Sequence, residues 1–316
     1  MKVFYWIVGC VIVLLGTLYI ILFTPSGNAL LKPYIEESIR KETQVKSELT
    51  VFRLTPIAFS FHLLFNGNNT IFFDGSYSIL RKSIDAIYQI NLEELKTLEH
   101  IFKKEIDNSL QLKGPFTAEG RVRKVKDLDF SMLSSIADGK LNATLHNDDL
   151  KAKFTNMQTI KLLDIFMYPK IFNATINGTL DYNLIREKGD VNAQLTNGKF
   201  TKNEVLDLAK KYASINMYKE DFNGDLNAKI DKKDIIATMK LKSNHSSITA
   251  KGTKLNTQTK TIDSKIDINA NGNPIEVRLK GDVSEPKVLI KADELIQREA
   301  TKVIVKEISK YLQNFF

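Results

Sequence analysis

The chain has 316 residues, 43% hydrophobic and 26% charged, which excludes a disordered or low-complexity protein and allows one large domain or two ordinary ones. A single cysteine excludes a disulfide scaffold and a cysteine-based metal cluster. The net charge is +8, but only eight of the 45 cations are arginine, the residue that most often binds phosphate and guanine. A nucleic-acid partner is therefore not favoured, and a mildly basic protein beside anionic lipid fits the charge equally well.

The chain begins with an apolar segment. Residues 3–23 contain no charged side chain, and 21 helical residues span roughly 30 Å, the thickness of the hydrocarbon core of a bilayer. A cleaved signal peptide has a shorter apolar region and a small-residue cleavage site, neither of which is present. We expect a transmembrane signal anchor over residues 1–24, with the bulk of the chain outside the cytoplasm and Cys10 inside the membrane.

A short juxtamembrane helix is predicted behind the anchor, within residues 25–45. The segment Pro33–Thr43 has an apolar stripe, and Pro33 suits the first position of a helix. This helix would either cap the next domain or lie in the membrane interface.

From Val51 onward, apolar and polar residues alternate with a period of two, which is typical of half-buried strands. The links between them are short, so neighbouring strands should be antiparallel. Helices are expected at residues 91–107, 157–167 and 203–218, each followed by a strand that opens near Phe116, Phe172 or Phe222. The predicted fold is mainly β with a few helices: a long curled antiparallel sheet over residues 46–291, built from degenerate strand and helix repeats.

One face of this sheet is aliphatic and must be covered. The sheet either closes on itself into a filled core or remains an open groove, which is tolerable only against lipid or a partner. In the open form, acyl chains would lie on the apolar floor of the groove. The candidate floor residues come from four predicted strands and are Leu226, Ala228, Ile230, Ile235, Met239, Leu241, Ile266, Ile268, Ile275, Val277 and Leu279.

The last 25 residues, 292–316, have the spacing of an amphipathic helix. This helix is a candidate docking element for a protein partner in the cell envelope. It supports an alternative function, in which the chain is a membrane-anchored assembly or adaptor protein with a closed β core and transports nothing.

We find no motif of catalysis or cofactor binding, so neither an enzyme, a cofactor nor a metal site is expected. The four histidines are scattered, without a clustered acidic partner, and the adjacent carboxylates Asp148 and Asp149 fall in a predicted turn. One basic run is notable. It is either the solvated face of a strand or a set of contacts with anionic headgroups, made by Arg121, Arg123, Lys124 and Lys126.

The C-terminal third contains the segments Asn197-Gly198-Lys199-Phe200 and Phe222-Asn223-Gly224-Asp225-Leu226, and its strands end on Gly281-Asp282-Val283-Ser284-Glu285-Pro286. With the N-terminal anchor, this pattern resembles the bacterial AsmA-like family. The resemblance implies a single-pass protein of the bacterial inner membrane with a periplasmic β-groove, similar to the bridge-like lipid transfer proteins. It further implies binding of phospholipid acyl chains in phospholipid transport or outer-membrane biogenesis. The chain is shorter than the family members that span a periplasm.

Overall fold

The computed structural model describes residue 17 and residues 19–98, 112–166, 170–202, 216–270, 272–283 and 286–291. The chain divides into two compact units. The N-terminal unit comprises Met1–Ile136, Asn142–Asn147 and Ile165–Met167, and the C-terminal unit comprises the remaining residues. In the part of the chain that is described, no helix is both long and apolar enough to cross a membrane. Most of the predicted anchor (residues 1–16 and 18) and all of the predicted C-terminal helix lie outside the described residues.

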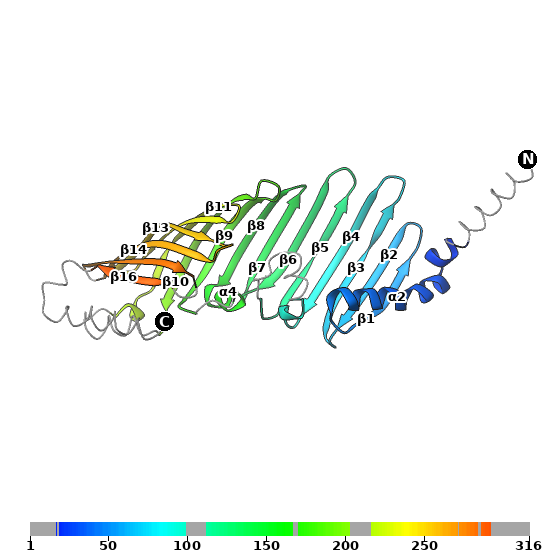
Figure 1. Cartoon of the computed structure of the whole chain (residues 1–316), viewed down its shortest axis with the longest axis horizontal. Coiled ribbons are helices and arrows are strands. Elements are labelled where there is room, and N and C mark those ends of the chain that lie inside the picture. Colours follow the sequence, from blue (N-terminus) through cyan, green and yellow to red (C-terminus); the bar gives the residue numbers. More distant parts are fainter. Residues whose placement is uncertain are drawn as a thin grey trace, which may run out of the picture. The chain divides into compact units, whose positions relative to one another are not determined.

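Sixteen strands form one sheet in which the strand order follows the chain order from β1 to β16 (Figure 1). The described strand pairings are all antiparallel, as expected from the short links, and the order does not return from β16 to β1, so the sheet is not closed. The strands are β1 (Ser47–Leu54), β2 (Ala58–Phe65), β3 (Asn69–Ser78), β4 (Ser83–Leu92), β5 (Phe116–Lys124), β6 (Leu128–Ile136), β7 (Gly139–His146), β8 (Asp149–Gln158), β9 (Phe172–Asn183), β10 (Lys188–Phe200), β11 (Phe222–Asp231), β12 (Asp234–Lys242), β13 (Ser246–Asn256), β14 (Thr261–Ala270), β15 (Asn273–Asp282) and β16 (Lys287–Lys291).

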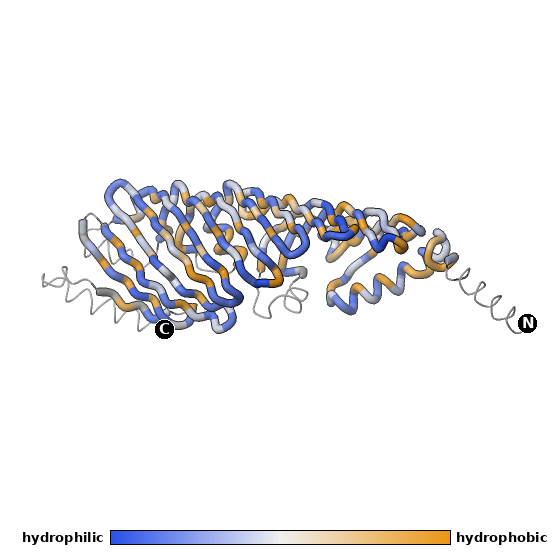
Figure 2. The backbone as a smooth tube through the Cα atoms, turned by 90° about the horizontal axis from the view of Figure 1, so that it is seen from above, coloured by the Kyte–Doolittle hydropathy of each residue, from blue (hydrophilic) through white to orange (hydrophobic). Residues whose placement is uncertain are grey.

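The mainly-β prediction is confirmed, and β5, β9 and β11 begin at Phe116, Phe172 and Phe222. Alternation of residue type along each strand gives each unit one apolar and one polar face, visible as alternating orange and blue in Figure 2. Because the side-chain period is two, a slip of one residue would reverse the faces, and this fixes the register of the strands.

Helix α2 (Pro25–Thr43) lies in the predicted helical segment 25–45 and begins eight residues before the apolar stripe of Pro33–Thr43. Thr24 is its N-cap, since the hydroxyl accepts a hydrogen bond from the amide of Gly27 at 3.2 Å, and Pro25 rather than Pro33 occupies the first helical turn. Pro33 lies inside the helix. The apolar run before Thr24 hides this start, because capping residues are easiest to see where a polar loop precedes them.

The helical segments between strands begin later than predicted where they are described. Strand β4 runs through Leu92 and is followed by the 3₁₀ turn η1 (Leu95–Leu98), so the predicted helix does not begin at residue 91. Strand β8 runs through Gln158, and α4 covers only Thr159–Ile165. Of the third predicted helix, residues 203–215 lie outside the described residues, and Tyr218 lies in η2 (Met217–Lys219).

The apolar face of the N-terminal unit is rich in aromatic residues. Phe59 lies 5.1 Å from Phe73 and 5.7 Å from Phe61, measured between ring centroids. Further along this face, the ring of Tyr88 covers Gly120, its cross-strand partner, and stacks on Phe130 at 5.4 Å. A Cβ on Gly120 would lie 2.8 Å from the Tyr88 hydroxyl, so only glycine leaves room for this contact.

Two β-bulges in the C-terminal unit are built in the same way. Asn156 in β8 and Asn197 in β10 both have a positive φ of 54°. The amide of Asn156 donates to the side-chain oxygen of Asn177 at 2.8 Å, and the amide of Asn197 donates to that of Asn223 at 3.0 Å. Asparagine tolerates the left-handed region, and a bulge bends its strand.

Candidate functional site: an apolar sheet face

The eleven predicted floor residues all lie on one face of the C-terminal unit. The register pairs Leu226 with Met239 between β11 and β12, and Ile266 with Val277 between β14 and β15. Residues that are directly opposite in an antiparallel pair point to the same face. The other predicted residues lie on the same face, as their cross-strand pairs show. These pairs are Ala228 with Ala237, Ile230 with Ile235, Leu241 with Ile248, Ile248 with Ile268, Ile268 with Ile275, and Ser264 with Leu279.

The apolar face, as we call it, extends beyond the predicted residues. It continues through β8, β9, β10 and β13, whose contribution the sequence did not single out as floor. In the row that contains Met239, the side chains are those of Phe154, Ala193, Leu226, Met239, Ala250, Ile266 and Val277, with Gly178 between β8 and β10. The neighbouring row contains Met157, Ile176, Leu195, Leu241, Ile248, Ile268 and Ile275, with Gly224 in β11.

Burial differs between these two rows. In the row of Leu241 the side chains from β8 to β13 are buried, and Leu241 itself is only 1% exposed. In the row of Met239 the alanines are buried, whereas the larger side chains Leu226, Met239 and Ile266 are half-buried. The larger aliphatic groups of that row therefore keep surface that an apolar ligand could cover.

The apolar face holds few polar side chains, and two of them form a hydrogen bond with each other. The hydroxyls of Thr253 and Ser264 lie at the same level on β13 and β14 and hydrogen-bond to each other at 2.7 Å. The opposite face carries ion pairs, including Lys265 with Glu276 at 2.8 Å and Arg278 with Asp263 at 3.6 Å. Acyl chains offer no hydrogen-bond partners, so only the first face suits them.

The apolar face is also large. Eight strands, β8 to β15, make seven intervals of about 4.8 Å, or roughly 34 Å across the strands. A bilayer leaflet is about half of a 30 Å hydrocarbon core, so the face is wide enough for more than one acyl chain laid across the strands.

The basic run lies in the N-terminal unit. Arg121, Arg123 and Lys124 end strand β5, and Lys126 lies in the turn to β6. Arg121 forms an ion pair with Asp85, because its Nε and Nη2 each donate a hydrogen bond to the carboxylate at 2.6 Å. These hydrogen bonds lower the pKa of Asp85 and raise that of Arg121. Among the described ion pairs, none contains Arg123, Lys124 or Lys126.

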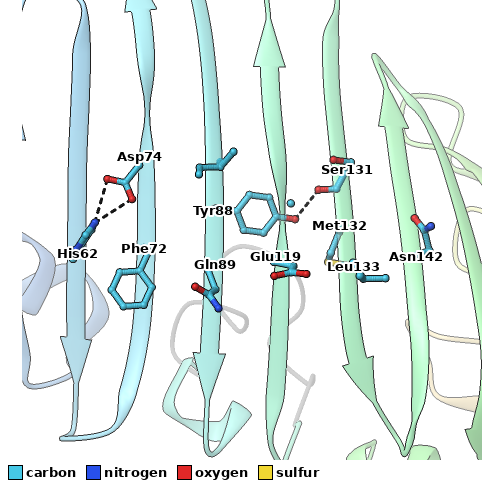
Figure 3. Close-up of a pocket in the computed structure, with 12 residues that line it drawn as sticks. His62, Phe72, Asp74, Tyr88, Gln89, Glu119, Ser131, Met132, Leu133 and Asn142 are labelled. Atoms are coloured by element: carbon cyan, nitrogen blue, oxygen red, sulfur yellow. Dashed lines mark hydrogen bonds and ion pairs between the residues drawn. The ribbon is translucent and has the colours of Figure 1, made fainter.

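A shallow hollow of about 700 Å³ lies on the polar face of the N-terminal unit (Figure 3). Its lining residues form cross-strand rows and include His62, Phe72, Asp74, Ile87, Gln89, Glu119, Ser131, Leu133 and Asn142. On the opposite face, the hydroxyl of Tyr88 donates to the backbone carbonyl of Ser131 at 2.9 Å, and burial raises the pKa of Tyr88 to about 12. No sequence motif marks this hollow.

His62 and Asp74 correct the expectation that no histidine has an acidic partner. Nε2 of His62 lies 3.0 Å from Oδ2 of Asp74, and the Ser60 hydroxyl donates to the same carboxylate. In a catalytic triad the two imidazole nitrogens contact the serine and the acid separately. Here Nε2 faces both partners and the serine proton is already bonded to the acid, so the cluster is not arranged to activate a nucleophile.

His146 also has an acidic partner, since its Nδ1 lies 2.8 Å from Oδ1 of Asp129 on an exposed surface. Within the described ranges, no three or more His, Cys, Asp or Glu side chains come together in a group that could hold a metal ion. Comparison with known proteins adds no assignment: no protein-family model, curated protein or solved structure matches the chain.

Proposed function

We propose that the protein holds the acyl chains of phospholipids along the apolar face of its C-terminal unit, as a single-pass protein of the bacterial inner membrane with its sheet in the periplasm. Its role would be in phospholipid transport or outer-membrane biogenesis. The observation that carries the proposal is the continuity of half-buried aliphatic side chains across neighbouring strands of an unclosed sheet. Each CH₂ group that leaves water for such a surface contributes about 0.8 kcal/mol.

Two sequence features support the membrane part of the proposal. The uncharged residues 3–23 have the length of a membrane-spanning helix. The strand pattern that ends at Pro286 resembles that of AsmA-like proteins. No catalytic step is proposed, because lipid carriage needs a surface and no reacting group.

Lipid analysis of the purified full-length protein tests the proposal. Phospholipid should remain bound after detergent purification and be detected by mass spectrometry of the extract. Ile266→Ser, on the apolar face, should reduce the bound lipid. Ile236→Ser is the matched control, since Ile236 is an isoleucine on the opposite face and is 50% exposed. Circular dichroism would establish that both variants are folded.

Equal lipid content in the two variants, or no lipid in the folded wild-type protein, would contradict the proposal. In that case the adaptor alternative would gain weight. Its closed β core is not what the structure has, so an adaptor would have to use the sheet edges or residues 292–316 instead.

A further inference from the structure

The turns at one edge of the N-terminal unit have an unusual composition. Short turns between strands normally carry Gly, Asn, Asp or Ser. The turns from β1 to β2, β3 to β4 and β5 to β6 instead expose aliphatic side chains: Ile57 and Ile79 are each 70% exposed, Leu80 is 96% exposed and Val125 is 54% exposed. Antiparallel hairpins of this order place all three turns at the same ends of the strands. We call this side of the sheet, uppermost in Figure 1, the edge that carries the turns.

Cations flank these apolar tips. Arg81 and Lys82 follow Leu80 directly, and Lys124 and Lys126 lie on either side of Val125. All four are exposed, and no described ion pair includes them. Asp127 is the nearest acid in sequence, and it accepts a hydrogen bond from the side chain of Asn147 at 3.2 Å. The edge therefore combines exposed aliphatic groups with a net positive charge, because these four cations outnumber Asp127.

The opposite edge of the same unit serves as an internal comparison. Its turn from β2 to β3 is Asn66-Gly67-Asn68, a polar sequence typical of tight hairpins. Glu93 and Glu94 follow β4 at that edge, and Asn68 donates to Glu93 at 2.9 Å. The described turn at the opposite edge therefore lacks the exposed aliphatic and basic side chains that the three turns at the edge of Leu80 share.

The described end of the N-terminal apolar segment, residues 19–23, leads into helix α2 at the apolar and basic edge. The side chain of Asn28 bonds to both backbone groups of Leu54, the last residue of β1 before the turn at Ile57. Glu36 accepts from the amide of Leu49 at 2.7 Å, so α2 runs antiparallel to β1 and its first turn lies at the hairpin end. A membrane crossed by residues 3–23 would therefore meet the edge that carries Leu80.

We infer that this edge, which we call the hairpin edge (Ile57, Ile79, Leu80, Val125, Arg81, Lys82, Lys124 and Lys126), docks on the surface of an anionic lipid bilayer. The aliphatic tips enter the interface, and the lysines and arginine lie at the level of the phosphates. Aliphatic groups beside basic ones are the usual composition of interfacial segments, and each basic residue near an anionic surface adds attraction that salt screens. The inference is independent of acyl chains on the apolar face of the C-terminal unit.

The test uses the full chain with Cys10→Ser, reconstituted into vesicles of phosphatidylcholine or of an equimolar mixture of phosphatidylcholine and phosphatidylglycerol. An environment-sensitive fluorophore is attached at Leu80→Cys or, as the control on the opposite edge, at Asn68→Cys. With phosphatidylglycerol present, the Leu80 probe should shift to the blue and be quenched by lipids that carry a nitroxide on the acyl chain, and the Asn68 probe should not. Adding Arg81→Glu and Lys126→Glu should reduce the quenching to the Asn68 level, as should high salt, whereas Lys46→Glu with Lys96→Glu should leave it unchanged.

Three results would overturn the inference. The first is a Leu80 probe that is no more quenched than the Asn68 probe in the anionic vesicles. The second is quenching that does not depend on phosphatidylglycerol or on the Arg81 and Lys126 charges. The third is a blue shift that follows the protein concentration in neutral vesicles, because this would show that a second copy of the chain covers the edge. Phospholipid retention by the purified protein is measured separately, so failure of either proposal is distinguishable from failure of the other.

Discussion

The side chain of Asn28 completes the hydrogen bonding of Leu54. Its Oδ1 accepts from the amide of Leu54 and its Nδ2 donates to the carbonyl, both at 2.9 Å, and Asn28 is only 6% exposed. Together with the hydrogen bond from the amide of Leu49 to the carboxylate of Glu36, this contact holds helix α2 against the outer edge of β1. An uncovered edge strand invites pairing with another chain, so α2 protects this end of the sheet from strand addition.

Asn28→Ala should therefore destabilise the protein, even though alanine is the better helix former. Two backbone groups of Leu54 lose their partner, and we expect a loss of about 1–3 kcal/mol in the free energy of unfolding. Urea unfolding of the detergent-solubilised protein measures it. Ser38→Ala, on the exposed side of the same helix, is the control and should change stability by less than about 0.5 kcal/mol.

Gly198→Ala should destabilise the C-terminal unit by overpacking. A Cβ at this position would lie 2.3 Å from Cζ of Phe172 and 2.9 Å from the carbonyl oxygen of Phe222. We expect a loss of about 1–3 kcal/mol, measured by urea unfolding. Adding Phe172→Leu removes the closer of these contacts, so the double variant should be more stable than the sum of the two single variants predicts. Strict additivity would contradict the contact.

Tyr88 should be among the last tyrosines to ionise, because burial raises its pKa to about 12 from an ordinary value of 10. A group whose pKa is raised on folding favours the folded state fully below its unfolded pKa, and the contribution is lost as pH rises from 10 through 12. Absorbance titration of wild-type and Tyr88→Phe protein tests this. The variant should lack a high-pH step and lose less stability between these pH values. An unchanged titration curve would show that Tyr88 is not shielded from solvent.

The four basic residues predicted from the run at β5 should not be equivalent. Arg121 is bound to Asp85, so Arg121→Gln should barely change the quenching of the Leu80 probe in anionic vesicles, while Lys126→Gln should reduce it. Arg121→Gln should also return the pKa of Asp85 upward towards its ordinary value, which NMR titration of the carboxyl would report. Equal effects of both variants on the probe would contradict the division of roles.

The alternation in the sequence was sufficient to predict most strands of the C-terminal unit and the residues that share its apolar face. In strands such as Thr261–Ala270 every second residue is aliphatic and every other one polar, so the face of each residue follows from parity alone. In contrast, β2 has the consecutive apolar residues Leu63, Leu64 and Phe65, and parity there does not separate the faces.

The contacts that could not be predicted depend on register or on topology. His62 meets Asp74 because β2 and β3 pair so that Ser60 lies opposite Asp74, and nothing local in the sequence indicates that register. The hairpin edge was missed for a similar reason. Ile57, Leu80 and Val125 are unremarkable one at a time, and only the strand order brings their turns to the same edge. The signal that was available was the lack of turn-forming residues at Ile79 and Leu80.

The central claim, that acyl chains lie on the apolar face, is tested most directly by photocrosslinking on β12. A benzophenone amino acid is placed at Met239, on the apolar face, or at Ile236, three residues away on the opposite face, in the full chain within vesicles of defined phospholipids. After irradiation, mass spectrometry should find phospholipid adducts from position 239 and none from position 236. Adducts of equal yield at both positions, or none at position 239 in the folded protein, would contradict the claim.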